Sequence, residues 1–362
     1  MIKRLALLVV FIIAAFIGNA FMNPIPRRIY DKSFRPNYGV SFSFEQSGWY
    51  GVPPREGFSK LITDYKFNWV RLPFFWDQMV DEDGNLKIDD LVWAIEEAKK
   101  RNVRIVVALG AKTPYYPEYH LPKYVESKLK FGEVIDVNSP VAGDILEIDR
   151  KVVEALSHFD NIIAWQVENE PLLRNINDLQ IDPSLVRQEV GVVRAIDAKK
   201  RPIILNTSSS GLVTKSADQL LKILKPGDIF GVNAYFKTQG VYLVNVNLFD
   251  NQVKINWPVG FYWSVQSWLF FSPDYQSAKK IADERGLQLW VLEMQAEPYI
   301  RVIEDADKNE YAFRPSDIGK ATDFLRSYKV DSIGFWGASF WQRRENIGDA
   351  KWSDSVKKII NN

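Results

Sequence analysis

The chain has 362 residues, of which 46% are hydrophobic and 14% aromatic, so it can bury one large core or two ordinary ones, and disorder is excluded. Its 46 Lys and Arg against 45 Asp and Glu leave a net charge of +1, which supplies no field to collect nucleic acid or an acidic partner. Small neutral ligands fit better, and the 12 Trp, 15 Tyr and 22 Phe suit either a core or flat surfaces for sugar rings. The absence of cysteine excludes thiolate nucleophiles and Cys-bound metals.

The first 22 residues predict an export signal. Lys3 and Arg4 precede an apolar run over residues 5–17, and small residues then follow at the spacing of a signal-peptide cleavage site. The run extended to residue 22 approaches the roughly 20 residues that span a bilayer, so a cleaved signal and a retained membrane anchor both stay open. We therefore expect an extracytoplasmic protein, secreted or attached to the membrane, with residues 23–362 as one folded domain.

Short apolar, β-branched runs alternate with longer amphipathic ones from residue 38 onward. The apolar runs predict eight strands, at residues 38–44, 69–72, 103–109, 162–167, 203–206, 229–232, 289–292 and 332–335. Helical patterns lie between or after them at residues 89–102, 145–156, 183–197, 216–224, 275–285, 316–327 and 352–360. Eight strands alternating with helices predict an α/β fold, a single (β/α)8 TIM barrel, although a doubly wound open sheet shares the same alternation.

One connection is much longer than the others. After Tyr235 the next helical pattern begins near residue 275, whereas connections of this kind usually have a handful of residues. The segment between them, about residues 237–273, is aromatic-rich and reads INWPVGFYWSVQSWLFFSP in its second half. It is a lid over a ligand site, an apolar surface for a membrane or partner, or a satellite core, and the sequence leaves all three open.

Polar side chains follow several of the predicted strands. In a (β/α)8 barrel the C-terminal ends of the strands converge on one mouth, so we expect these residues to meet there: Arg71, Glu168, Asn169, Glu170, Asn233, Tyr235, Glu293 and Trp336. Glu170 and Glu293 would face each other across the mouth. This is the arrangement of a retaining glycosidase, in which one carboxyl protonates the leaving oxygen and the other, roughly 5 Å away, attacks the anomeric carbon.

Asn169, Glu170 and Pro171 together resemble the Asn-Glu-Pro signature of the clan A glycoside hydrolases, which are retaining (β/α)8-barrel glycosidases and include cellulases. The segment LWVLEMQAEPY resembles the strand-seven segment of the same clan. The resemblance covers about residues 38–341 and implies that Glu170 is the catalytic acid/base and that Glu293 is the nucleophile.

The resemblance also implies the residues that bind substrate. Arg71 matches the arginine beside the nucleophile, Tyr235 the tyrosine that hydrogen-bonds it, and Trp336 the tryptophan that floors the sugar site. Asn169 is expected to bind the sugar 2-hydroxyl. Cellulase-type members usually carry a histidine where this chain has Asn233, so we do not assign the substrate of cellulases to this chain. An ordinary ion pair remains an alternative role for Arg71, and plain core for Trp336.

Two further glutamates compete for the catalytic roles: Glu168 for that of the acid, and Glu297 for that of the nucleophile. The chain has two histidines. His120, after the third predicted strand, is a candidate for substrate contact, whereas His158 lies at a helix end and is expected to be structural.

The sequence therefore predicts a β-glycoside hydrolase, or a transglycosylase on the same site, that works by double displacement on a carbohydrate. No metal or other cofactor is required, and a monomer is expected. A carbohydrate-binding barrel without turnover and a barrel enzyme of another chemistry are the alternatives. Glucan, mannan, galactoside and a capsule or host glycan all fit as substrates, and both internal and terminal cleavage stay open.

Overall fold

The computed structural model describes residues 9–10, 31, 33–174, 176–236, 238–239, 244–248, 251–255, 262–263, 273–300, 302–308 and 313–361. The predicted export signal, apart from residues 9–10, and most of the aromatic segment at 237–273 lie outside the described residues. Within that segment the structure gives four short strands, β9 (Thr238–Gln239), β10 (Val244–Leu248), β11 (Asn251–Ile255) and β12 (Tyr262–Trp263). In the ranges described, no helix has the length and apolar character needed to cross a membrane.

Eight parallel strands close into a barrel in the order β1-β14-β13-β8-β7-β5-β3-β2. They are β1 (Asn37–Ser41), β2 (Trp69–Pro73), β3 (Arg104–Leu109), β5 (Ile162–Val167), β7 (Ile203–Ser208), β8 (Ile229–Ala234), β13 (Gln288–Gln295) and β14 (Ser332–Trp336). The first strand pairs with the last, with Asn37 opposite Ser332. This closure is the predicted (β/α)8 barrel, and it excludes the open sheet.

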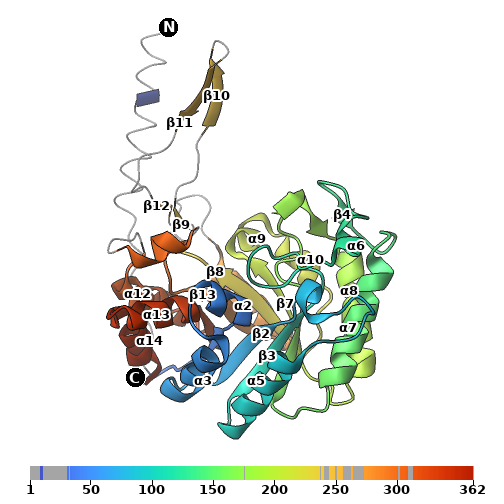
Figure 1. Ribbon diagram of the computed structural model, residues 1–362, viewed down its shortest axis with the longest axis horizontal. Helices are drawn as coiled ribbons and strands as arrows, with labels where there is room; N and C mark the ends of the chain where they lie inside the picture. The colour runs from blue at the N-terminus through green and yellow to red at the C-terminus, as the bar shows by residue number, and fades with distance from the viewer. Residues whose placement is uncertain are drawn as a thin grey trace.

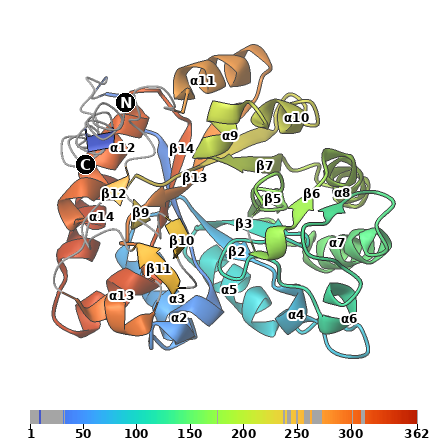
Figure 2. The same cartoon turned by 90° about the horizontal axis from the view of Figure 1, so that it is seen from above.

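Helices surround the barrel (Figures 1 and 2). The main ones are α3 (Pro54–Asp64), α5 (Asp89–Lys100), α7 (Ala142–Leu156), α8 (Pro183–Ile196), α10 (Ala217–Leu221), α11 (Tyr275–Glu284), α12 (Pro315–Arg326) and α14 (Lys351–Asn361). Local signals set their starts: Asp182 caps α8 by accepting from the Ser184 N–H, and Asp274 caps α11 by accepting from the Ser277 N–H. Amphipathic helices of this kind bury an apolar stripe toward the protein core, and α14 does so against α12 and α13 (Ala338–Asn346).

Several boundaries differ from the prediction, and at two places a separate short helix is the reason. The strand predicted at 38–44 ends at Ser41, because the Ser43 side chain accepts a hydrogen bond from the Gln46 N–H and caps the short helix α2 (Phe44–Trp49). The helix predicted at 216–224 is shorter, and the separate helix α9 (Ser209–Thr214) precedes it. The sequence patterns do not predict α2, α3, α9 or α13. Of these, α2 and α9 have only six residues each, whereas α3 has 11.

Two tryptophans fill the barrel interior near the N-terminal ends of its strands. The Trp69 and Trp290 rings stack with their centroids 5.1 Å apart, within a buried apolar cluster. Gly39 and Gly334 make room for them, since a Cβ atom on Gly39 would lie 2.1 Å from the Trp69 ring and one on Gly334 would lie 2.6 Å from it. The polar strand ends therefore stand at the opposite end of the barrel, above a packed interior.

Candidate active site

Both carboxylate oxygens of Glu293 accept hydrogen bonds from neighbouring strands. Arg71 Nη2 donates to Oε1 at 2.6 Å, and the Tyr235 hydroxyl donates to Oε2 at 2.8 Å. Burial, and next the charge of Glu293, raise the pKa of Tyr235 well above its usual range, so the hydroxyl stays a donor. A β-bulge between Val291 and Glu293 breaks the register with β8, as bulges do where a side chain is aimed at a site.

Arg71 is fully buried and makes three side-chain contacts. Besides the bond to Glu293, its Nε donates to Ser41 Oγ at 2.9 Å and its Nη1 donates to Gln166 Oε1 at 3.1 Å. These contacts come from β1, β5 and β13, so the guanidinium spans the barrel interior beneath the mouth. Arg71 does form an ion pair, and its partner is the proposed nucleophile Glu293.

Glu170 follows β5 and is 8% exposed. Its backbone N–H donates to Asn206 Oδ1 at 3.0 Å. Burial raises the pKa of Glu170 to about 8, and the negative charges of Glu293 and Glu118 act in the same direction. The Glu170 carboxyl is therefore mainly protonated at neutral pH, as a proton donor must be.

Asn169 is oriented by two amides. Its Oδ1 accepts from Asn206 Nδ2 at 2.9 Å and from Gln166 Nε2 at 3.3 Å. Among the residues that the structure describes, Asn169 Nδ2 has no hydrogen-bond partner, so this group is available to donate to a ligand hydroxyl. Sequence reasoning missed Asn206 and Gln166, whose only signal is a polar residue inside a buried barrel strand.

Asn233 lies on β8 next to Asn206, whose Nδ2 is 3.4 Å from Asn233 Oδ1. Asn233 Nδ2 is buried beside the Glu170 carboxyl, and in the described part of the chain it makes no hydrogen bond of ordinary geometry. The Asn233 amide acts on Glu170 so as to lower its pKa, against the larger effect of burial. A donor without a partner beside the proposed acid can be satisfied by a bound ligand.

Glu168 connects the end of β5 to the segment after β3. Its Oε1 accepts from the Ala111 N–H at 2.7 Å and its Oε2 accepts from the Lys112 N–H at 2.6 Å. Burial raises the pKa of Glu168 to about 7. Because both oxygens are engaged with backbone groups, the geometry favours Glu170 over Glu168 as the proton donor.

Trp336 ends β14, and its ring stacks on that of Tyr115 with the centroids 4.2 Å apart. Glu297 lies beside it and accepts a hydrogen bond from the Tyr50 hydroxyl at 3.1 Å. Burial raises the pKa of Glu297 to about 8, and hydrogen bonds from Tyr50 and Trp336 oppose this effect. Glu297 thus bonds to aromatic residues at the edge of the site. Glu293 is the carboxylate that Arg71 binds, so it is favoured over Glu297 as the nucleophile.

The two histidines lie among structural contacts. His120 is buried, stacks on Phe75 with ring centroids 3.8 Å apart, and has its Nδ1 3.3 Å from a carboxylate oxygen of Asp77. His158 follows α7 and packs on Phe159. Within the described ranges, no group of three His, Cys, Asp or Glu side chains is arranged to hold a metal ion.

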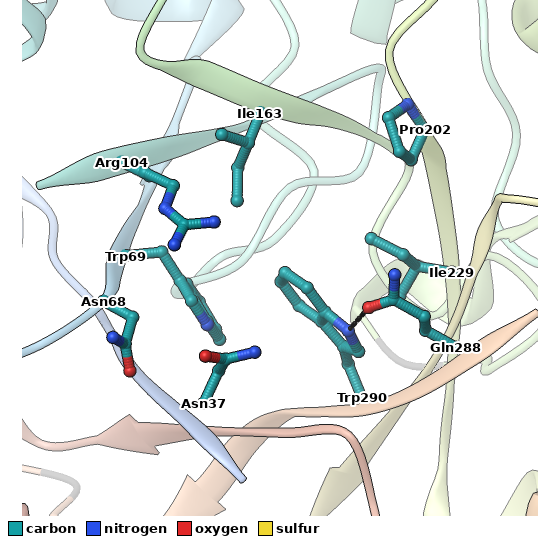
Figure 3. Close-up of a pocket in the computed structure, with 9 residues that line it drawn as sticks. All are labelled: Asn37, Asn68, Trp69, Arg104, Ile163, Pro202, Ile229, Gln288 and Trp290. Carbon is teal, nitrogen blue, oxygen red and sulfur yellow. Dashed lines mark hydrogen bonds between the residues drawn. The ribbon is translucent and has the colours of Figure 1, made fainter.

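A separate pocket of about 240 Å³ opens at the other end of the barrel. Figure 3 shows its lining, which includes Trp69, Arg104, Trp290 and the Gln288 side chain that accepts from the Trp290 indole. These residues come from the starts of their strands, and no carboxylate lines the pocket. Glu170 and Glu293 lie at the ends of their strands, so the barrel mouth is the candidate site.

A family model described as Cellulase (glycosyl hydrolase family 5) matches residues 32–253, which is more than half of the chain. No curated protein matches the sequence.

Solved structures share the fold. GH5_18 from Streptomyces cattleya, in complex with GlcNAc, has 12% identity and a TM-score of 0.58, with 91% of this chain and 80% of that one covered. PbGH5A, a glycoside hydrolase family 5 enzyme from Prevotella bryantii B14, has 12% identity and a TM-score of 0.54, with 92% and 100% covered. The β-galactosidase from psychrophilic Marinomonas ef1 has 12% identity and a TM-score of 0.56, with 90% of this chain but only 59% of that one covered.

Proposed function

This chain belongs to glycosyl hydrolase family 5, and we propose that it cleaves β-glycosidic bonds with retention of configuration, using Glu170 as acid/base and Glu293 as nucleophile. Family membership makes it a glycoside hydrolase. The observation that carries the proposal is the contrast between the two carboxyls. Glu293 accepts from a cation and a hydroxyl, whereas burial raises the pKa of Glu170 to about 8.

In the first step a Glu293 oxygen attacks the anomeric carbon, and a glycosyl ester forms as the bond to the leaving oxygen breaks. Glu170 gives its proton to that oxygen, so the leaving group departs as a neutral alcohol. Arg71 and Tyr235 keep the attacking carboxylate in one orientation, which is what a positioned nucleophile requires.

In the second step Glu170 takes a proton from water, the water oxygen attacks the anomeric carbon, and the ester to Glu293 breaks. The two steps consume one water molecule and leave the configuration unchanged. The switch of Glu170 from acid to base has a physical cause here, because the charge of Glu293 helps to raise the pKa of Glu170. Esterification removes that charge and so makes Glu170 a stronger acid when it must be ionised.

Three side chains supply polar and apolar contacts for the sugar. Asn169 Nδ2 is available to donate to the 2-hydroxyl, and Asn233 Nδ2 is a second donor beside Glu170. The half-buried Trp336 ring, with one side stacked on Tyr115, supplies the apolar contact. A transglycosylase would use the same first step and replace water by a sugar hydroxyl in the second. The mechanism draws on side chains alone.

Trapping of the glycosyl-enzyme tests this assignment. Dinitrophenyl 2-deoxy-2-fluoro-β-glycosides of glucose, galactose and mannose slow the second step more than the first, so the ester accumulates. Peptide mass spectrometry should find the fluorosugar on Glu293. A label on Glu168 or Glu297 would disprove the assignment of the nucleophile.

We also propose an extracytoplasmic location, with residues 1–22 as a cleaved signal or as a membrane anchor, and a monomeric enzyme. The basic start and the apolar run of the first residues support the location. Fractionation of the cells that express the full chain, with N-terminal sequencing of the product, separates a cut form from an anchored one. Size-exclusion chromatography with light scattering tests the monomer.

A further inference from the structure

Glu170 and Trp336 lie on opposite sides of the barrel mouth. In the closed order of strands, β5 and β14 are four positions apart in either direction. Glu170 protonates the leaving oxygen, so the leaving group lies on the β5 side of the mouth. The sugar that is attacked lies above Glu293, and any further sugars on its non-reducing side extend toward Trp336.

Tyr115 stands at this far end of the site. It belongs to the segment after β3, yet its ring stacks on Trp336 at the end of β14, at a centroid distance of 4.2 Å. Burial raises the pKa of the Tyr115 hydroxyl well above its usual range, and the charges of Arg71 and Glu293 act on it in opposite directions. Tyr115 therefore crosses the side of the mouth where a chain of sugars would leave.

Several contacts hold Tyr115 in this position. The Thr113 N–H donates to the Glu118 carbonyl at 2.8 Å, and the Glu118 N–H donates to the Tyr115 carbonyl at 2.7 Å. The Glu118 carboxylate also pairs with buried Lys112 at 3.2 Å. Tyr115 itself has φ +86°, a conformation that costs energy for a residue with a Cβ atom and persists where the surroundings determine it. The segment from Thr113 to Glu118 is thus fixed in place, and we call it the wall of the site.

The turn that follows Trp336 is held by a second set of residues. Glu297, which hydrogen-bonds Tyr50 and Trp336, packs so closely on Gly337 that a Cβ atom there would lie 2.8 Å from the Glu297 Cβ. Trp341 Nε1 donates to the Ala296 carbonyl at 2.9 Å and fixes the same turn. Trp336 is therefore half-buried, with the turn that follows it held in place by protein contacts.

We propose that Tyr115 and Trp336 close the glycone end of the site, so that it takes one terminal sugar and the enzyme is exo-acting. It releases a monosaccharide from the non-reducing end of a β-linked oligosaccharide or glycoconjugate. This inference rests on the proposed function.

The test compares aryl glycosides that differ by one sugar. The 4-nitrophenyl β-glycosides of glucose, galactose and mannose identify the preferred sugar, and the matching 4-nitrophenyl β-disaccharides probe the closed end. The full-length enzyme should release nitrophenol directly from the monosaccharide compound. From the disaccharide compound it should first release the terminal monosaccharide, and nitrophenol should follow only after a lag. Reducing-end-labelled oligosaccharides of the same sugar should shorten by one unit at a time. Release of an intact disaccharide at a comparable rate, or early products from internal cleavage, would overturn the proposal.

Substitution of the wall supplies a second readout. Tyr115→Ala should raise the direct release of intact disaccharide from the nitrophenyl disaccharide, relative to the rate on the monosaccharide compound, by about tenfold or more, because it opens the glycone end. Tyr116→Ala is the matched control, since this ring lies in the same segment but is 80% exposed, and its product pattern should not change. Internal cleavage that still depends on both glutamates overturns only the exo assignment. Activity that survives loss of both glutamates overturns the proposed mechanism.

Discussion

Lys112 Nζ donates a hydrogen bond to the main-chain carbonyl oxygen of Glu170 at 2.9 Å, so a fully buried cation holds the backbone of the proposed acid. The same ammonium group donates to the Leu173 carbonyl at 3.1 Å. Its charge also favours the ionised form of Glu170 and thereby lowers the pKa of that carboxyl. Lys112 therefore acts as a positioning residue with an electrostatic effect on the acid.

Lys112→Met should lower kcat/KM on the order of tenfold to a hundredfold, because two carbonyl groups lose their donor and Glu170 shifts. Removal of the positive charge should also raise the pKa of Glu170, so the alkaline limb of the pH profile should move to higher pH. The measurement is kcat/KM on the best nitrophenyl glycoside from pH 5 to pH 10.

Lys123→Met removes an exposed lysine from the same part of the chain and serves as the control. Its pH profile should match that of the wild type. If Lys112→Met loses activity with an unshifted alkaline limb, the effect on the charge of Glu170 is absent.

The two proposed catalytic carboxyls should differ in their response to substitution. Glu293→Gln should reduce kcat by on the order of 10⁴-fold or more, since no nucleophile remains. Glu170→Ala should also be slow, but azide should restore its turnover on an activated aryl glycoside, because a small anion attacks the ester without a base. Glu284→Gln, an exposed carboxyl on α11, is the control. Near wild-type rates in both Glu293→Gln and Glu170→Ala would contradict the assignment.

The stereochemistry of the first product checks the double displacement directly. Proton NMR of a nitrophenyl β-glycoside reaction should show the β-anomer of the released sugar before it equilibrates in water. Two inversions at the anomeric carbon require this result. An α-anomer as the first product would mean that water attacks the substrate itself and that no ester to Glu293 forms.

Glu297→Gln should change the dependence of stability on pH. Burial raises the pKa of Glu297 to about 8 in the folded protein, above the ordinary value of 4.5 that applies when the chain is unfolded. Between these two pKa values the folded state holds a proton that the unfolded state releases. The contribution of protonated Glu297 to the free energy of unfolding is therefore fully present below about pH 4.5 and is lost as pH rises through about 8. Glutamine carries no charge, so at pH 8 the free energy of unfolding of the variant should exceed that of the wild type by on the order of 1 kcal/mol, and its Tm should be higher.

The difference in Tm between Glu297→Gln and the wild type should shrink toward pH 5. Differential scanning calorimetry at several pH values measures it. A Tm difference that is independent of pH would show that Glu297 is ionised in the folded protein as well.

The alternation of apolar and amphipathic runs was sufficient to predict the barrel, because strand and helix periods are local properties of the chain. Given a parallel barrel, the ends of the strands must converge, so Arg71, Glu170 and Glu293 could be placed at one mouth before their contacts were known. The short helices α2 and α9 could not be predicted in this way, since six residues are too few for an apolar stripe to stand out from a loop.

Tertiary structure alone decided the supporting contacts. Asn206 orients Asn169 from a neighbouring strand. Lys112, which follows β3, donates to the carbonyl of Glu170, which follows the paired strand β5. Tyr115 meets Trp336 only because the chain closes on itself between β1 and β14. No local pattern encodes such pairings, because a side chain's partner across a closed barrel depends on strand register and loop path. The residues that bound the proposed sugar pocket are therefore set by the fold as a whole.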